Sequence, residues 1–401
     1  MKKQLKLRIF SLLLMFFTVF STVITARAEA PVPMQVLSEE ASDLGVADGS
    51  LELNCKSVIL MEEKTGAILY KQNADEALPP ASVTKIMTLL LVMEAMEAGT
   101  VHADTRISVS ANAASMGGSQ VYLKEGEVMT VEELLKSVII ASANDAAVAL
   151  AEHISGSVSA FVEKMNRRAE QLGMKNTRFE NVTGLDDTAK EHLTSARDIA
   201  IMSRALIRHD MVLKYSSVWM DSIRDGAFGL TNTNRLVRFY QGCTGLKTGS
   251  TAKAGFCVSV TAKRGSLSLI CVVMGAESRD ARNAIAAQLL DWGFANYTLY
   301  GAEAEELSPL RVVGGVQNEC RVGYASFCCV VPKGTEGSVE KRLSLPESLT
   351  APITSGDEVG CVEFLLNGEK IGERPITACE TVKRIGFFEI LWRMLSRFLL
   401  I

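Results

Sequence analysis

One helix limits the fold of this chain more than any other feature of its sequence. Residues 82–97 read SVTKIMTLLLVMEAME, and their apolar positions cover most of a helical surface. A helix that is apolar on nearly every side is stable only when it is buried on nearly every side. The sequence therefore predicts a domain whose other elements surround this helix.

The elements on either side of that helix define the class of the domain. Residues 57–70 form two strand-like runs around the turn formers 64–66, which is a hairpin pattern. Residues 245–276 read as two β-rich runs joined by a turn at residues 263–266. Early strands, central helices and late strands predict an α+β fold over residues 51–302, with an antiparallel sheet sandwiched by helices. The further helices are predicted over residues 131–141, 145–153, 159–172, 196–207 and 281–297.

The pattern changes after the last of these helices. Over residues 306–381 short strand-like runs alternate with turns that contain Gly, Pro or Asn, which predicts a small all-β domain. The final segment, residues 383–401, places its polar residues on one helical face and predicts an amphipathic helix lying in a membrane surface. Charged residues interrupt this segment, so a membrane-spanning helix is disfavoured. A helix docked on the all-β domain is the remaining alternative.

The N-terminus has the pattern of a secretory signal peptide. A basic start, an apolar run over residues 9–24 and the triplet Ala26-Arg27-Ala28 predict a signal peptide over residues 1–28. An uncleaved membrane anchor is the alternative. Residues 29–50 are small and polar and read as a linker. The predicted signal peptide carries five basic and no acidic residues, so its removal lowers the formal net charge from −4 to −9. An exported, acidic protein is a poor candidate for binding nucleic acid.

The cysteines and histidines restrict the possible chemistry. The nine cysteines are odd in number, and Cys328 and Cys329 are adjacent, so most are expected to be buried thiols. A disulfide between Cys257 and Cys271 is the alternative. The four histidines lack metal-ligand spacing. A zinc hydrolase is therefore disfavoured, and the sequence predicts neither a metal nor another cofactor.

A serine and a lysine at the start of the buried helix form the first candidate for catalysis. Ser82 and Lys85 are three residues apart, so they lie on one helical face within hydrogen-bonding reach. The free N–H groups of a helix start favour developing negative charge. Burial lowers the pKa of a lysine, so that Lys85 can act as a general base. Taken alone the pattern is weak, because Ser-x-x-Lys usually means a capped surface helix.

Two polar triplets follow further along the chain. Ser142-Ala143-Asn144 interrupts two apolar helices, where buried polar groups need partners, although an N-cap is the simpler explanation. Lys247-Thr248-Gly249 lies on a run that would form a sheet edge, where the glycine lets a ligand backbone approach. A surface lysine at a strand end is the alternative there.

The order and spacing of these three elements resemble a known superfamily. Ser142 lies 60 residues after Ser82, and Lys247 lies 105 residues after Ser142. Ser-x-x-Lys, Ser-x-Asn and Lys-Thr-Gly in this order resemble the penicillin-binding and serine β-lactamase superfamily. The likeness is strongest to its low-molecular-mass penicillin-binding proteins, the D-Ala-D-Ala carboxypeptidases. It extends over most of residues 51–297 and to the all-β domain and tail. The stretches that carry it include PASVTKIMT, ASANDAAVALAEHISGS and GCTGLKTGSTAKAGFCVSVTAKR.

The resemblance implies a role for each candidate residue. Ser82 would attack the carbonyl of the penultimate D-alanine and form an acyl-enzyme, with Lys85 taking its proton. Ser142 would relay a proton to the leaving D-alanine. Asn144 would hold the substrate amide and orient Lys85.

The resemblance also implies how the substrate is bound. Lys247 and Thr248, followed by Gly249, would bind the terminal carboxylate of the peptide. The backbone N–H groups of Ser82 and Ser250 would form the oxyanion hole. Arg282 aligns with an arginine that family members place near that carboxylate, with a helix-surface arginine as the alternative.

The implied function is serine-type D-Ala-D-Ala carboxypeptidase activity on peptidoglycan stem peptides, with β-lactams as covalent inhibitors. Such an enzyme works in wall synthesis at the extracytoplasmic face of the cell membrane. A β-lactamase is the nearer alternative, but it often uses a Glu-x-x-Leu-Asn loop, which is missing between Asn144 and Lys247. A non-catalytic envelope protein that binds peptidoglycan or β-lactams is the other alternative. The intact set of Ser82, Lys85, Ser142 and Lys247 argues against it. Ala143 and Ser250, where relatives carry Gly and His, leave the deacylation rate open.

Overall fold

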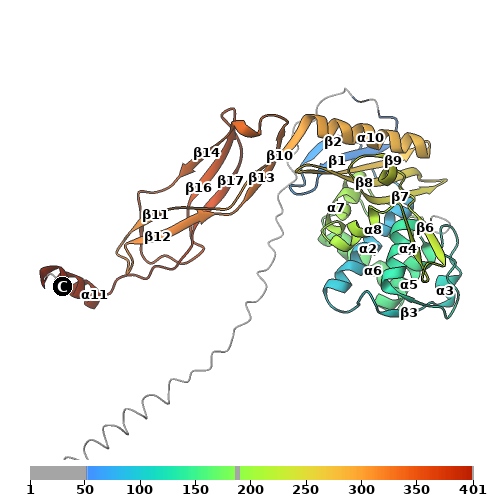
Figure 1. Cartoon of the computed structure of the whole chain (residues 1–401), viewed down its shortest axis with the longest axis horizontal. Coiled ribbons are helices and arrows are strands. Elements are labelled where there is room, and N and C mark those ends of the chain that lie inside the picture. The colour runs from blue at the N-terminus through green and yellow to red at the C-terminus, as the bar shows by residue number, and fades with distance from the viewer. Residues whose placement is uncertain (1–50, 52, 186–189, 400–401) are drawn as a thin grey trace, which may run out of the picture. The chain divides into compact units, whose positions relative to one another are not determined.

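The computed structural model describes residues 51, 53–185 and 190–399. The predicted signal peptide and the linker that follows it lie outside the described residues. Figure 1 draws the chain coloured from blue at the N-terminus to red at the C-terminus, with most of the described elements labelled.

A five-stranded antiparallel sheet is the centre of the first half of the chain. Its strand order is β2-β1-β9-β8-β7. The hairpin predicted over residues 57–70 is present as β1 and β2. Residues 245–276 contain three strands and not the two expected runs, because a tight turn at residues 252–254 separates β7 from β8. Gly255, with φ of +66°, closes that turn in a conformation that favours glycine. The strands are β1 (Ser57–Glu62), β2 (Ile68–Gln72), β7 (Cys243–Thr251), β8 (Gly255–Arg264) and β9 (Leu267–Ala276).

Alternate side chains of the sheet enter two separate cores. Ile59 on β1 faces the same core as α2 (Lys85–Glu97) and α7 (Ala196–Leu206), whereas its neighbour Leu60 faces the core beneath α10 (Arg279–Asn296). This alternation follows from the two-residue period of a strand. Helices therefore cover both faces, as Figure 1 shows, and the predicted α+β sandwich is confirmed.

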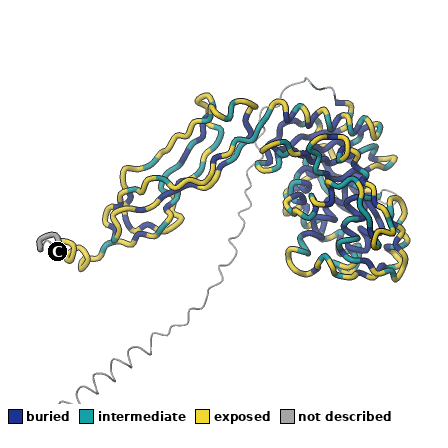
Figure 2. Tube along the Cα trace, viewed as in Figure 1, coloured by how far each residue is buried: buried dark blue, intermediate teal, exposed yellow. Residues whose placement is uncertain are grey.

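The predicted central helix is buried as its composition requires. Every residue of α2 from Lys85 to Met93 is buried. Figure 2 shows the dark blue of buried residues concentrated inside this half of the chain. The other elements of this half are α3 (Ala111–Ala114), α4 (Val131–Ala141), α5 (Asn144–Ser155), α6 (Val158–Gln171), α8 (Asp210–Ser216), α9 (Leu236–Phe239), and the strand pairs β3 (Arg106–Ser108) with β4 (Val128–Thr130) and β5 (Met220–Ile223) with β6 (Phe228–Thr231).

The second half of the chain is built from strands, as predicted. A six-stranded sheet has the order β14-β16-β17-β12-β11-β15, and β10 pairs with β13. Phe327 and Phe364 stack in its core, with ring centroids 4.1 Å apart. The strands are β10 (Tyr297–Ala302), β11 (Glu305–Val313), β12 (Glu319–Tyr324), β13 (Phe327–Pro332), β14 (Val339–Ser344), β15 (Ser348–Thr350), β16 (Glu358–Leu366) and β17 (Glu369–Ala378).

The C-terminal segment forms helix α11 (Phe387–Leu399), which begins four residues later than expected. Its apolar side chains are exposed, among them Phe388 at 83% and Trp392 at 73%. Its apolar face is therefore not docked on the all-β domain. Within the described residues, no helix is long and apolar enough to span a bilayer.

Cys257 and Cys271 are free thiols. Cys257 on β8 belongs to the core beneath α2, and Cys271 on β9 belongs to the core beneath α10. Because the two side chains lie on opposite faces of the sheet, the alternative disulfide between them is wrong. The expectation that most cysteines are buried holds fully only for Cys257, Cys271 and Cys320, since the other six are partly or fully exposed.

Candidate active site

Ser82 lies on a single 3-10 turn, Ala81–Thr84, that leads into α2. The regular α-helix therefore begins at Lys85 and not at Ser82 as expected. Ala81 has φ of +49°, a conformation that is rare for alanine. Thr84 Oγ1 donates a 2.8 Å hydrogen bond to Ala81 O and closes the turn. Strained backbone of this kind is found where a site needs one defined geometry.

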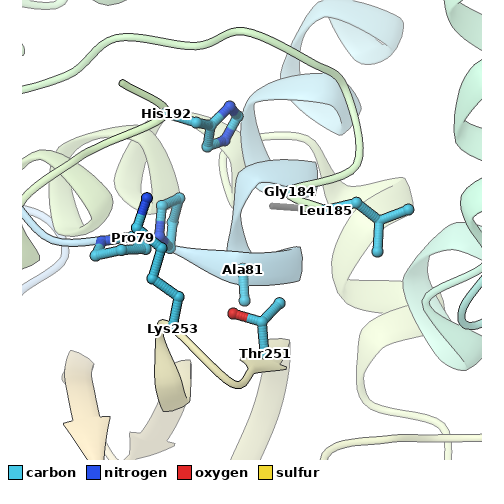
Figure 3. A pocket seen from close by; sticks show the side chains of 8 residues that line it. Pro79, Ala81, Gly184, Leu185, His192, Thr251 and Lys253 are labelled. Carbon is cyan, nitrogen blue, oxygen red and sulfur yellow. The ribbon is translucent and has the colours of Figure 1, made fainter. Parts of the chain in front are cut away.

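The turn is supported from behind by a loop, as Figure 3 shows. A Cβ atom at Gly184 would lie 1.8 Å from Ala81 O, so only glycine fits there. His192 Nδ1 accepts a 3.0 Å hydrogen bond from the Glu180 N–H, so Nε2 carries the proton and donates to Thr84 Oγ1 at 2.7 Å. Burial lowers the pKa of His192 to about 4, which keeps the ring neutral. The hollow among these residues is only about 10 Å³.

Lys85 meets Ser82 across the start of the helix. Its Nζ lies 2.8 Å from Ser82 Oγ and donates a second 2.8 Å hydrogen bond to Thr183 O. The side chain is fully buried. Burial, and next the charge of Lys247, lower the pKa of Lys85 well below its ordinary value, while Asp145 opposes this shift. The amine is therefore prepared to accept a proton from Ser82.

Ser142 and Asn144 lie in the break between α4 and α5. Ser142 is left-handed, with φ of 63°, and Ala143 occupies the N-cap of α5 without a side-chain bond, so the N-cap explanation is wrong. Ser142 Oγ accepts a 2.8 Å hydrogen bond from Lys247 Nζ. Asn144 Nδ2 donates to Gly117 O at 2.7 Å, and its buried Oδ1 has no partner among the described residues.

The third triplet lies on β7, the edge strand of the sheet. Lys247 is only 1% exposed, so the surface-lysine alternative is wrong. Burial and the nearby Arg282 lower the pKa of Lys247 to about 7. Gly249 is required for another reason than expected, because a Cβ there would lie 2.8 Å from Ser82 N. The glycine thus lets the edge strand pass directly against the turn that carries Ser82.

Thr248, Ser250 and Arg282 complete the predicted set. Thr248 Oγ1 donates a 2.8 Å hydrogen bond to Thr233 Oγ1. Arg282 on α10 is only 3% exposed, so the helix-surface alternative is wrong, and its Nη1 donates to Cys257 O at 3.3 Å. Burial lowers the pKa of this guanidinium to about 10, and it still remains charged at neutral pH.

Six of the nine predicted residues line one open cleft of about 600 Å³. Lys85 and Lys247 do not line it, but each is hydrogen-bonded to a serine that does, Lys85 to Ser82 and Lys247 to Ser142. Asn144 does not line it, and its side chain makes no hydrogen bond to Lys85, which leaves its expected orienting role without support among the described contacts. The lining residues are Ser82, Ser119, Ser142, Trp219, Thr231, Asn232, Thr233, Arg235, Phe239, Thr248, Gly249, Ser250, Arg279 and Arg282.

Eight of these lining residues escaped sequence reasoning. Five of them come from the end of β6, the segment before α9 and α9 itself, where no motif or regular periodicity marks them: Thr231, Asn232, Thr233, Arg235 and Phe239. The Asn232-Thr233-Asn234 run before α9 is the one local signal, since such residues form side-chain turns. Asn232 and Asn234 do so here, accepting from N–H groups two residues further on.

Comparison with known proteins agrees with this arrangement. A family model described as D-alanyl-D-alanine carboxypeptidase matches residues 44–278, and one described as penicillin-binding protein 5, C-terminal domain, matches residues 294–384. The chain belongs to the D-alanyl-D-alanine carboxypeptidase family. The predicted family is thereby confirmed, as is the predicted enzyme class, a serine-type D-Ala-D-Ala carboxypeptidase.

Individual relatives cover most of the chain. D-alanyl-D-alanine carboxypeptidase DacF of Bacillus subtilis is 40% identical over 359 residues, which is 88% of this chain and 92% of the relative. DacC of Escherichia coli is 35% identical over 358 residues, 85% of this chain and 87% of the relative. The crystal structure of penicillin-binding protein 5 from Haemophilus influenzae has a TM-score of 0.75 and 33% identity, covering 84% of this chain and 99% of that one.

A further solved structure concerns β-lactams. Penicillin-binding protein D2 of Listeria monocytogenes, determined in an ampicillin-bound form, is 32% identical with a TM-score of 0.57. The match covers 61% of this chain and 99% of that one.

Proposed function

We propose that Ser82 and Lys85 act as the nucleophile and general base of this carboxypeptidase. The observation that carries the proposal is the 2.8 Å contact between Ser82 Oγ and a fully buried Lys85 Nζ. Burial holds the pKa of Lys85 well below that of an exposed lysine, so its amine gives up its own proton more readily and can accept one from Ser82. The pair thus meets both requirements of a base, reach and pKa.

The reaction proceeds through an ester. Ser82 Oγ bonds to the carbonyl carbon of the penultimate D-alanine while its proton moves to Lys85 Nζ. The C–N bond then breaks, and the proton that Lys85 took from Ser82 passes by way of Ser142 to the departing amine of the terminal D-alanine. Water hydrolyses the ester, which restores Ser82 and releases the shortened peptide. The 2.8 Å bond from Lys247 Nζ to Ser142 Oγ supports the relay by Ser142.

The backbone N–H groups of Ser82 and Ser250 form the oxyanion hole in this proposal. The close passage of Gly249 against Ser82 N supports the pairing, because it brings the edge strand and the turn together. Such fixed donors stabilise the negative charge that develops on the carbonyl oxygen.

The terminal carboxylate of the substrate binds to Thr248 and Lys247 on β7. Arg282 supplies a buried positive charge beside them. Asn144 does not line the cleft, so its proposed role as an acceptor for the substrate amide rests on its buried, unpartnered Oδ1 alone.

β-Lactams acylate Ser82 by the same attack on their strained amide, and we propose that the resulting ester hydrolyses slowly. No carboxylate occurs among the described residues that line the cleft. Glu180, for example, accepts hydrogen bonds from the N–H groups of Lys190 and Glu191 outside the cleft. An efficient β-lactamase needs a group that activates the deacylating water, which disfavours that alternative.

We further propose that the protein is exported through the signal peptide of residues 1–28 and acts on peptidoglycan outside the cytoplasm. Residues 51–302 form the peptidase domain and residues 306–381 the all-β domain.

Helix α11 lies in the membrane surface in this proposal. The exposed side chains of Phe387, Phe388 and Trp392 support the assignment, because an amphipathic helix buries such side chains in the lipid. Unchanged binding to lipid vesicles after deletion of residues 387–401 would contradict this last assignment.

Release of free D-alanine from an acylated peptide ending in D-Ala-D-Ala tests the central proposal. We expect release by the wild type and by Ser217→Ala, a matched control at an exposed serine. Ser82→Ala is expected to lose roughly 10⁴-fold or more in kcat. Failure of the wild type to release D-alanine would overturn the proposed activity, and normal release by Ser82→Ala would overturn the assignment to Ser82. Rapid penicillin turnover without D-alanine release would favour the β-lactamase.

A further inference from the structure

A short loop, residues 181–185, reaches the amine of Lys85 from behind the Ser82 turn. The loop belongs to no helix or strand, and its three central residues are buried. The carbonyl oxygen of Thr183 accepts a 2.8 Å hydrogen bond from Lys85 Nζ. The amine has one other hydrogen bond to a described residue, the 2.8 Å contact with Ser82 Oγ. The loop therefore supplies one of the two polar contacts that hold the amine.

The Thr183 carbonyl determines where the lone pair of Lys85 can point. A neutral amine has two N–H groups and one lone pair, whereas a carbonyl oxygen can only accept a hydrogen bond. The amine must therefore turn an N–H group toward Thr183 O, and its lone pair lies elsewhere. Ser82 Oγ is the remaining partner, so the lone pair is available to the hydroxyl proton. Once the proton has moved, Thr183 O still accepts a hydrogen bond from the ammonium group, which favours the charged form.

The side chain of Asn181 sets the shape of the loop. Its Oδ1 accepts hydrogen bonds from the N–H groups of Thr183 at 3.1 Å and of Gly184 at 2.6 Å. Its Nδ2 donates a 2.8 Å hydrogen bond to Leu185 O. An asparagine that binds the N–H group two residues further on forms a side-chain turn, which replaces regular secondary structure. One amide group thus joins both ends of the loop.

The hydrogen bond from Gly184 N–H to Asn181 aims the carbonyl. Thr183 O and Gly184 N–H belong to one planar trans peptide unit, in which the two groups point in opposite directions. Asn181 Oδ1 binds the N–H end of this unit. The carbonyl end therefore points away from Asn181, and there it meets Lys85 Nζ.

Two further contacts hold the loop in place. Gly184 packs so closely on Ala81 O that a Cβ atom would lie 1.8 Å from it, and Figure 3 shows the two residues side by side. Thr88 Oγ1 donates a 2.8 Å hydrogen bond to Val182 O. Thr88 follows Lys85 by three residues on α2, so both side chains lie on one helical face. The backbone is thus held on either side of the carbonyl that Lys85 contacts.

We propose that Asn181 is a positioning residue for the general base. Its side-chain amide directs Thr183 O at Lys85 Nζ, and that carbonyl turns the lone pair of the amine toward Ser82 Oγ. Asn181 does not line the cleft and acts only through the loop. The inference rests on the proposed role of Lys85 as the base and adds no step to the reaction.

Stopped-flow labelling of the full chain with a fluorescent penicillin tests the inference, because it measures the affinity of the first complex and the acylation rate constant separately. We expect Asn181→Ala to lower the acylation rate constant roughly 10- to 100-fold, as for a misplaced catalytic group, and to change the affinity less than about twofold. Asn181→Ser, whose hydroxyl forms the same turn more weakly, should lie between Asn181→Ala and the wild type. Equal acylation rate constants in the three proteins would overturn the inference.

Asn166 provides a matched control. It is also half-buried, and its side chain binds the backbone of the same segment, accepting from Phe179 N–H at 2.8 Å and donating to Phe179 O at 2.9 Å. Asn166→Ala should therefore lower the free energy of unfolding about as much as Asn181→Ala, but leave the acylation rate constant unchanged. A similar loss of acylation in both variants would mean that Asn181 acts only through stability, which contradicts the inference.

The pH profile of acylation separates positioning from general damage. Because Thr183 O stabilises the protonated amine, losing this hydrogen bond lowers the pKa of Lys85. Lys247 and Asp145, whose charges also act on that pKa, are unchanged in Asn181→Ala. Acylation of this variant should therefore level off at a lower pH than in the wild type, and at a lower rate constant. A lower plateau with an unshifted midpoint would contradict the role of the carbonyl.

Direct titration of Lys85 separates a failure of this inference from a failure of the proposed function. NMR of isotope-labelled lysine side chains measures its pKa without any acylation, and the absence of one signal from Lys85→Met assigns it. Even if penicillin does not label the wild type, the pKa of Lys85 should be lower in Asn181→Ala and unchanged in Asn166→Ala. Identical pKa values in Asn181→Ala and the wild type would overturn the inference.

Discussion

The same residue type meets opposite conditions in the two halves of this chain. Next to the cleft, Lys85 and Lys247 are buried with no ion pair to a carboxylate among the described residues, and burial lowers the pKa of both. In the all-β half, Lys341 is exposed and lies 2.8 Å from the Glu305 carboxylate, and its hydrogen bonds to Glu305 and Tyr324 raise its pKa. A lysine therefore becomes a base only where the loss of its water on folding outweighs the effect of any nearby carboxylate, as burial outweighs Asp145 at Lys85. The predictions below test that contrast.

The largest expected effect is on acylation. Lys85→Met keeps the volume of the side chain but removes the amine that faces Ser82 Oγ. We expect the rate constant for acylation by penicillin to fall by roughly 10⁴-fold, the upper range for a lost general base. Stopped-flow labelling with a fluorescent penicillin measures it, with Lys341→Met as the control. A loss of less than tenfold would mean that another group takes the proton.

The next effect concerns Lys247, whose replacement is expected to stabilise the folded protein even though it abolishes activity. The pKa of Lys247 is about 7 in the folded chain against 10.5 as the ordinary value, so the unfolded state binds the proton more tightly. Lys247 therefore lowers the free energy of unfolding. This destabilisation is complete below pH 7 and decreases as the pH rises from 7 to 10.5. Lys247→Met should therefore raise the free energy of unfolding at pH 7, by up to about 5 kcal/mol, while D-alanine release is lost. Denaturant unfolding at pH 7 and pH 10 measures the gain, which should shrink at the higher pH. A destabilised Lys247→Met at pH 7 would contradict the argument.

A smaller effect concerns His192 behind the Ser82 turn. Its pKa of about 4 lies below the ordinary value of 6.5, so protons bind preferentially to the unfolded state. The stability of the wild type falls as the pH drops from 6.5 toward 4, with a contribution from this residue of roughly 3 kcal/mol. His192→Gln keeps a donor toward Thr84 but does not titrate. Its unfolding free energy should depend less on pH in that interval, and identical pH profiles for the two proteins would refute this.

The smallest effect is expected in the all-β half. Lys341→Met breaks an ion pair whose lysine side chain is 39% exposed. Water and salt screen such pairs, so the free energy of unfolding should change by less than about 1 kcal/mol. D-Alanine release should be unaffected. A change as large as that of Lys247→Met would remove the contrast between the two halves.

The sequence predicted the elements whose patterns are local. The buried helix, the first hairpin and the all-β half follow from hydrophobic periodicity and turn residues, and the three motifs follow from residue order. One strand boundary was missed, because Ala254-Gly255 lies inside a continuous β-rich run and its turn depends on Gly255 adopting a positive φ. The helix start was also misplaced by three residues, since a strained Ala81 has no signature in composition.

What the sequence did not predict depends on contacts between distant segments. Gly249 looked like an opening for a ligand, but it is needed for the approach of β7 to Ser82 N. The sequence around Arg282 was equally compatible with a position on the helix surface and a position in the cleft. The packing of α10 on the sheet buries the side chain and decides between the two. His192 was considered only as a possible metal ligand. Its ring is hydrogen-bonded to Glu180 and to Thr84, and Thr84 lies 108 residues earlier in the chain. A contact between such distant residues leaves no local pattern in the sequence.

The pH dependence of penicillin acylation tests the role of Lys85 most directly. If the buried amine is the base, the second-order rate constant for labelling Ser82 should rise with pH and level off well before pH 10.5, the ordinary pKa of lysine. A rate constant that instead climbs tenfold per pH unit up to that value would mean that Lys85 titrates like an exposed lysine. The central claim would then be wrong.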